Sequence, residues 1–135
     1  MSCLRWPRQL VTGAAGRRTA PPGTRTNTNE RQRHMHIQVI TFKLDGIDEA
    51  AYQAHVEQSA PAFAAMPGLR AKIWLANEQT NTYGGIYTWD DVAAMKAYQS
   101  GKIFQGLQAN PHMIDVAVRD FSVLAGPTRV TRGGY

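Results

Sequence analysis

The chain has 135 residues, enough for one domain, and a formal net charge of +5 at pH 7. Residues 1–34 hold seven arginines and one acid, whereas residues 35–135 hold eight basic and nine acidic residues. The domain itself is therefore near neutral, which removes the main argument for a nucleic-acid partner. No apolar run approaches the ~18 residues that a membrane span requires, so we also expect no membrane segment.

We divide the chain at Met35, which stands directly before the first strand-like run. Residues 1–34 are rich in Arg, Thr, Gly and Pro, a composition typical of a disordered extension. Three interpretations are open for them: an extension from an upstream start codon, which we favour, a transit peptide, or a nucleic-acid-binding arm. Cys3, the single cysteine, lies here. The domain thus has no disulfide or cysteine nucleophile, which suits a cytoplasmic location.

The domain begins with a β-branched and aromatic run at residues 36–43, which predicts a strand. A helix over residues 48–66 follows, with Asp48 as its cap, and we expect Pro61 to kink or interrupt it. Apolar and small residues at spacings of three and four give this helix one face that packs. That face is made by Tyr52, Val56, Ser59 and Phe63.

Further along, the pattern predicts a strand hairpin, a second helix with a short amphipathic continuation, and a last strand. The strands are expected at residues 69–78, 83–89 and 114–124, and the continuation at 103–107. Asp90 or Asp91 caps the second helix, which ends before Ser100. Residues 126–135 form a C-terminal tail with some strand character at 128–130.

The order β-α-β-β-α-β predicts an α+β domain of the ferredoxin-like type over residues 35–125, with an antiparallel sheet. Helices lie on one face of such a sheet, yet both faces are apolar here. In the second strand Ile73 points one way, while Trp74 and the stem of Lys72 point the other. We therefore expect the uncovered face to pack on a second copy of the chain, as a homodimer.

The short hairpin loop predicts which residues of its two strands lie opposite each other. The expected pairs are Asn77 with Thr82, Trp74 with Gly85, Lys72 with Tyr87 and Arg70 with Trp89. A glycine opposite an indole leaves room for the ring. This surface has two interpretations. It is either a wall for a flat substrate, with Lys72 or Tyr87 donating to a phenolate or developing oxyanion, or packed aromatic filling of a dimer core.

His55 lies on the first helix, beside its apolar face. As a base near neutral pH it could deprotonate a phenol or hydroquinone, and the alternative is an ordinary surface histidine. No pair of histidines in the domain has the spacing of metal ligands on a helix. We accordingly expect neither a metal nor another cofactor.

Two stretches carry a distinctive order of residues: Met66-Pro67-Gly68-Leu69-Arg70-Ala71-Lys72-Ile73-Trp74 and Tyr83-Gly84-Gly85-Ile86-Tyr87. With the acid-capped helix after them, they resemble the YdhR family of proteins named as monooxygenases. The similarity covers most of residues 35–125. It implies a dimeric α/β barrel, in which two ferredoxin-like sheets pack face to face. It also implies oxygen insertion into an aromatic compound, without metal or flavin.

We therefore expect a homodimeric, cofactor-independent monooxygenase that uses molecular oxygen on a small aromatic or polyphenolic compound, in a pocket between sheet and helices. The expected catalytic residues are His55 or Tyr87, which would deprotonate the substrate, and Trp74, which would shape the pocket. The expected substrate-binding residues are Lys72, Tyr52, Phe63 and Gly85. The alternative is a ligand-binding or stress-related dimer that catalyses nothing. A purely structural module would leave no cavity between helices and sheet.

Overall fold

The computed structural model describes residues 34–133, and the interpretations of the N-terminal extension lie outside these residues. The described elements are β1 (His36–Leu44), α3 (Glu49–Ala64), β2 (Leu69–Asn77), β3 (Thr82–Trp89), α4 (Val92–Gln99), α5 (Lys102–Ala109), β4 (Met113–Ser122) and α6 (Ala125–Val130). The strands form one antiparallel sheet in the order β2-β3-β1-β4. This is the predicted ferredoxin-like arrangement. Among the described helices, none is long and apolar enough to cross a membrane.

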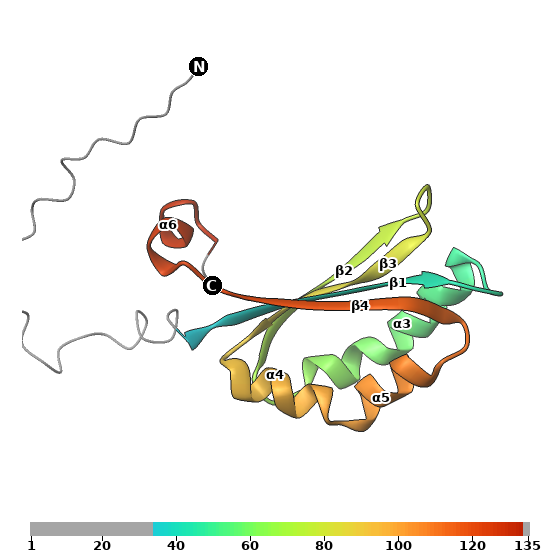
Figure 1. The fold of residues 1–135 in the computed structure, drawn as a ribbon, viewed down its shortest axis with the longest axis horizontal. Coiled ribbons are helices and arrows are strands. Elements are labelled where there is room, and N and C mark those ends of the chain that lie inside the picture. Colours follow the sequence, from blue (N-terminus) through green and yellow to red (C-terminus); the bar gives the residue numbers. More distant parts are fainter. Residues whose placement is uncertain (1–33, 134–135) are drawn as a thin grey trace, which may run out of the picture.

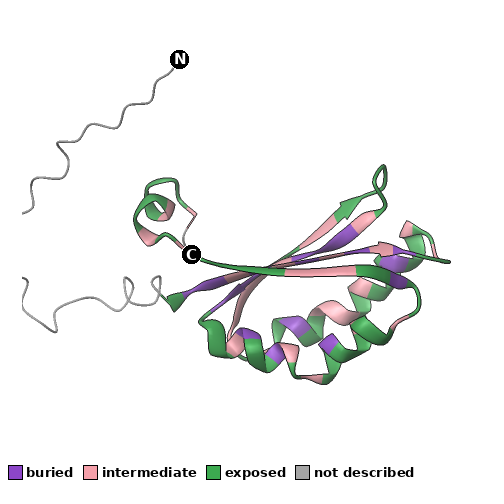
Figure 2. Ribbon diagram, in the orientation of Figure 1, coloured by how far each residue is buried: buried purple, intermediate pink, exposed green. Residues whose placement is uncertain are grey.

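Helices α3, α4 and α5 cover one face of the sheet and leave the other face open (Figure 1). Strand β1 shows the division, because buried and half-exposed residues alternate along its whole length. Buried residues gather between the sheet and these helices (Figure 2). The core consists of Ile40, Phe42, Leu44, Tyr52, Phe63, Tyr83, Tyr87, Trp89, Met95, Tyr98, Phe104 and Met113. Two thirds of them are aromatic, so the face under the helices is built mainly of flat side chains.

Aspartates begin the two helices that the sequence predicted to be acid-capped. The Asp48 side chain accepts a backbone amide of α3 at 2.9 Å, and the Asp91 side chain accepts one of α4 at 2.8 Å. Asp91 rather than Asp90 is therefore the second cap. Helix α3 continues through Pro61, so the expectation of an interruption there was wrong. Proline removes one amide donor, and the helix ends only three residues later, so few hydrogen bonds depend on it.

The hairpin pairs in the predicted register over most of its length, with Trp74 opposite Gly85. At the start of β2 the register shifts, and Leu69 instead of Arg70 pairs with Trp89. The predicted pairing of Arg70 was wrong because β2 carries an extra residue there, which a regular alternation does not anticipate. The strand expected at 128–130 was also wrong, since these residues belong to helix α6.

The open face of the sheet carries apolar side chains that the described chain does not cover. Ile73 of β2 is 60% exposed, and Phe121 of β4 is 53% exposed. Ile73 pairs with Ile86 of β3, which in turn pairs with Val39 of β1. An apolar band therefore runs over β2, β3 and β1 on the side away from α3, α4 and α5, and on β4 it meets Arg119 and continues at Phe121.

Candidate functional site

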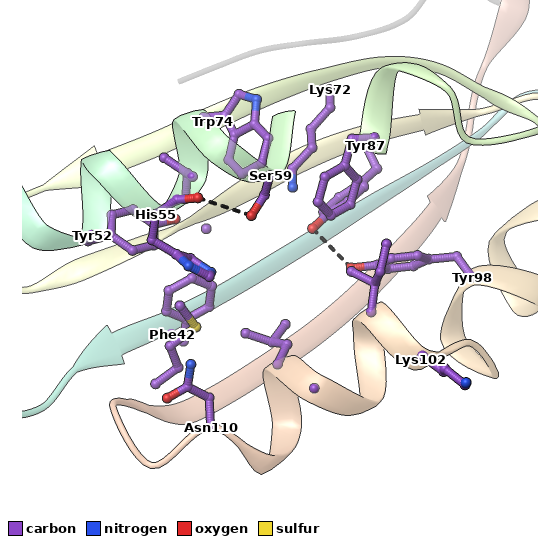
Figure 3. A pocket seen from close by; sticks show the side chains of 17 residues that line it. Phe42, Tyr52, His55, Ser59, Lys72, Trp74, Tyr87, Tyr98, Lys102 and Asn110 are labelled. Carbon is purple, nitrogen blue, oxygen red and sulfur yellow. Dashed lines mark hydrogen bonds between the residues drawn. The ribbon is translucent and has the colours of Figure 1, made fainter. Parts of the chain in front are cut away.

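A cavity of about 310 Å³ lies between the helical layer and the sheet. Helices α3 and α5 form one side of it, and strands β2 and β3 supply much of the other (Figure 3). Its volume falls within the range of small-molecule sites. Six of the seven residues predicted from the sequence line it, namely His55, Tyr87, Trp74, Lys72, Tyr52 and Phe63. A purely structural module would have filled this space with side chains.

Lys72 points from β2 into the cavity and ends among three aromatic rings (Figure 3). Its Nζ atom lies 3.3 Å from the centroid of the Trp74 ring, 3.5 Å from that of Phe63 and 4.5 Å from that of Tyr87. The faces of aromatic rings attract a cation at such distances. Phe63 and Trp74 also contact each other edge to face, with centroids 5.4 Å apart. The three rings thus form a box around the amine, which we call the aromatic box.

Burial in this box lowers the pKa of Lys72 to about 7, because the charged amine loses hydration there. The ring faces act in the opposite direction, since they favour the ammonium form. Within residues 34–133, no aspartate or glutamate lines the cavity, whereas Lys102 and His55 do. The side chains that can ionise to cations in the cavity therefore have no carboxylate from the described residues within it to balance their charge.

The two glycines of β3 have separate reasons to lack a side chain. Gly84 lies on the cavity wall and has φ 149°, and a β-carbon there would come 1.9 Å from the Ile40 carbonyl oxygen of β1. Gly85 is the one predicted site residue that does not line the cavity. It lies beneath the stem of Lys72 instead. Its contribution to the site is thus space for the lysine rather than contact with a ligand.

Tyr87 is 3% exposed, and its hydroxyl group lies 3.4 Å from that of Tyr98. This hydrogen bond is long for two hydroxyl groups. Burial above all, and then the neighbouring Tyr98, raise the pKa of Tyr87 well above its ordinary value. Its hydroxyl group therefore stays protonated near neutral pH, which suits a hydrogen-bond donor and not a base. Burial similarly raises the pKa of Tyr52 to about 12, with Tyr83 adding to the effect.

The mouth of the cavity carries the more exposed polar groups. His55 is exposed on α3 and turns its ring toward the cavity, opposite Asn110 at the end of α5 (Figure 3). Ser59 also lines the wall, and its hydroxyl group donates to the His55 carbonyl oxygen at 3.0 Å. His55 is therefore in contact with solvent and with the cavity at once, as a residue that exchanges protons between them would need to be.

Sequence reasoning missed Tyr98, Lys102 and Asn110, all of which line the cavity. Tyr98 lies in the second predicted helix, where no motif singled it out. Lys102 and Asn110 flank the amphipathic stretch at 103–107, and that position was the only signal available. The crossing of α5 over the sheet, which brings them to the wall, depends on tertiary packing.

No group of three His, Cys, Asp or Glu side chains in the part of the chain that the structure describes could hold a metal ion. His36, the first residue of β1, does not line the cavity and pairs with Asp120 at 2.6 Å instead. The chemistry available in the cavity is therefore that of aromatic stacking, the amines of Lys72 and Lys102, hydroxyl donors and an imidazole at the mouth. Such a set can bind a flat molecule, remove a proton from it and hold the resulting anion.

A family model described as "Putative mono-oxygenase ydhR" matches residues 37–134. No curated protein matches the sequence. Among the solved structures that share the fold are NE2512, SnoaB and a protein from Caulobacter crescentus. NE2512 from Nitrosomonas europaea, of unknown function, is 21% identical, with 70% of this chain and 93% of that chain covered and a TM-score of 0.60. SnoaB, a cofactor-independent oxygenase from Streptomyces nogalater, is 19% identical over 67% and 94% of the two chains, with a TM-score of 0.56. A "putative antibiotic biosynthesis monooxygenase" from Caulobacter crescentus is 16% identical over 73% and 97%, with a TM-score of 0.55.

Proposed function

The chain belongs to the family of mono-oxygenase-like proteins named after ydhR, and from this premise we propose that it is a cofactor-independent oxygenase. Its substrate is a small aromatic or polyphenolic compound, bound in the cavity between the helices and the sheet. The observation that carries the proposal is the cavity itself. It joins a flat aromatic wall to titratable and hydrogen-bonding groups, Lys72 and Tyr87 inside and His55 at the mouth.

The reaction that these groups support turns a hydroxyarene and O₂ into a quinone and water. The substrate loses its hydroxyl proton, and a carbon of the electron-rich anion bonds to O₂ to form a peroxide, which takes up a proton. His55 then removes the proton from that carbon. The O–O bond breaks, a C=O bond forms, and the hydroxide that leaves becomes water. The substrate supplies all four electrons, so the balance needs no other reductant.

In this scheme the aromatic residues position the substrate. Trp74 and Phe63 contact each other at right angles and give the cavity two differently oriented ring faces. Tyr52 and Tyr87 stay protonated and can donate hydrogen bonds to oxygen atoms on the ligand. The apolar surroundings also keep water away from the anion while it reacts.

The test is oxygen consumption by the purified full-length protein with anthrone- and quinol-type substrates, chosen by a thermal-shift screen of aromatic compounds. With ¹⁸O₂ we expect one labelled oxygen in the quinone and the other in water. His55→Gln should lower turnover roughly 100-fold, while His112→Gln, at an exposed histidine that does not line the cavity, should not. Absence of oxygen uptake with every compound that stabilises the protein would overturn the proposal.

We also propose that the protein works as a homodimer, joined through the open sheet face. The apolar band with Ile73 and Phe121 supports this, because a soluble single chain rarely leaves such a surface bare. A two-fold axis would bring the same band of both copies together.

We also propose a cytoplasmic location, since a domain without cysteine suits a reducing compartment.

The competing function is a dimer that binds an aromatic molecule and catalyses nothing. The same cavity supports it, because the aromatic box alone explains binding. One experiment distinguishes the two functions. A compound that stabilises the protein, is recovered unchanged in air and causes no oxygen uptake favours the binding protein.

A further inference from the structure

We propose that Lys72 takes the proton from an acidic hydroxyl group of the ligand and then, as an ammonium, holds the resulting oxyanion inside the aromatic box. This inference rests on the proposed function for the kind of ligand, a hydroxyarene, and assigns the first step to a residue. The proton moves from the ligand oxygen to the Lys72 nitrogen, so the pair passes from neutral to one cation and one anion. His55 is left to act on the ring carbon.

The position of the amine is the first argument. The Lys72 Nζ atom lies 3.3 Å from the Trp74 ring centroid and 3.5 Å from that of Phe63. Both rings also line the cavity. A flat ligand that packs beside these rings can therefore place a hydroxyl group within reach of the amine, which is the geometric requirement for a base.

The missing counter-ion is the second argument. A buried ammonium normally has a carboxylate partner, since an unpaired buried charge is costly. Of the cavity-lining residues in the described range, none is acidic, and the ion pairs there join His36 to Asp120 and Arg70 to Asp90 instead. The anion that completes the site must then come from the ligand.

The protonation state is the third argument, and it favours a hydroxyl group over a carboxylate. With a pKa of about 7, Lys72 is present near neutral pH both as amine and as ammonium. The free amine can accept a proton, and transfer from a phenol of similar pKa costs little free energy. The ring faces then stabilise the ammonium that forms. A carboxylic acid is already ionised at pH 7 and would leave this basicity unused.

The experiment is binding of 4-nitrophenol to the full-length protein under nitrogen, between pH 5 and pH 9.5. The phenolate absorbs at a longer wavelength than the phenol, so the spectrum reports the form that is bound. We expect bound phenolate at pH values where the free probe is mostly neutral. Because the complex needs one proton shared between two groups, affinity should be highest near pH 7 and fall about tenfold per pH unit well above it. 4-Nitroanisole, which has no ionisable hydroxyl group, should show no such maximum.

Three variants locate the effect. Lys72→Met should weaken 4-nitrophenol binding at least tenfold at pH 7 and leave any bound probe neutral. Lys72→Arg stays charged at all these pH values, so it should bind phenolate without the loss of affinity above pH 7. Lys96→Met removes an exposed lysine outside the cavity and should match the unaltered protein. Circular dichroism identifies any variant that does not fold.

The unaltered protein alone can decide the question, because its pH profile needs no variant. Failure to bind 4-nitrophenol, or an affinity that stays flat above pH 7, would overturn the inference. The result is also independent of oxygen chemistry. If the affinity for 4-nitrophenol has its maximum near pH 7 but the protein consumes no O₂, the proposed role of Lys72 stands and the proposed oxygenase activity is wrong. If the protein consumes O₂ but its affinity for 4-nitrophenol does not change with pH, the oxygenase activity stands and the role of Lys72 is wrong.

Discussion

The stem of Lys72 runs over Gly85, and a β-carbon at position 85 would lie 2.8 Å from the Lys72 Cε atom. Carbon atoms do not approach so closely, so the lysine can take its path into the aromatic box only because residue 85 has no side chain. The residue paired with Gly85 across the hairpin is Trp74. The sequence predicted that the glycine makes room for the indole ring, and the structure shows that the lysine stem uses the room.

Gly85→Ala should therefore displace the amine without unfolding the protein. The closest contact is with the flexible end of a side chain, and the Ile73 carbonyl oxygen at 3.3 Å needs to move only slightly, so we expect a stability change within ~1 kcal/mol. Lys72 should move toward water, and its pKa should rise from about 7 by at least one unit. NMR titration of the lysine side chains measures this. Gly126→Ala, whose added carbon would meet nothing within 4 Å, is the control, and an unchanged Lys72 pKa in Gly85→Ala would contradict the assignment.

Lys72 should also make stability depend on pH. Its pKa in the folded state, about 7, is lower than in the unfolded chain. Between these two values the unfolded state binds more protons, so the free energy of unfolding should rise from pH 7 to pH 9. Lys72→Met should abolish this rise, and Lys96→Met should keep it. Urea denaturation at both pH values provides the measurement, and an equal rise in Lys72→Met would show that another group is responsible.

Tyr87→Phe should separate ligand binding from stability. The hydrogen bond to Tyr98 is long, at 3.4 Å, so its loss should cost no more than about 1 kcal/mol. If the Tyr87 hydroxyl group donates to the ligand, binding of 4-nitrophenol should weaken roughly fivefold. Tyr98→Phe loses the same internal bond and serves as the comparison. Thermal unfolding and spectroscopic titration give the two quantities, and equal binding by Tyr87→Phe and the unaltered protein would exclude this donor.

Ile73→Lys should disrupt the proposed dimer. It places a charge within the apolar band, at its β2 end, where burial against a second copy would be costly. Light scattering after size-exclusion chromatography should give the mass of one chain for Ile73→Lys and of two chains for the unaltered protein. Val92→Lys changes an exposed apolar residue of α4 and should leave the dimer intact. A dimer that persists in Ile73→Lys would place the interface elsewhere.

Removing residues 1–34 should change neither the fold nor the assembly. Met35 is 2% exposed, so the packed domain includes it. The shortened chain, beginning at Met35, should unfold within a few degrees of the full chain and give the same dimer by light scattering. A shift to a monomer would mean that the extension takes part in the interface.

Local patterns were sufficient to predict the order of elements and most of the hairpin register. Alternation with a period of two marks the strands, and a short polar loop fixes which residues face each other, so Trp74 opposite Gly85 followed from sequence spacing. The helix caps at Asp48 and Asp91 followed from local chemistry in the same way. Features that break a regular period could not be predicted from local patterns. Examples are the extra residue near Arg70 and the helix at 125–130.

The sequence by itself thus determined a ferredoxin-like domain and the residues from which a site could be built. It also showed that both faces of the sheet are apolar, and for that reason it could not assign either face. Only the packing of α3, α4 and α5 decided that the face with Trp74 and Tyr87 lies under the helices and that the face with Ile73 stays open (Figure 1). The lowered pKa of Lys72 likewise depends on burial among rings from separate elements, which no local pattern encodes.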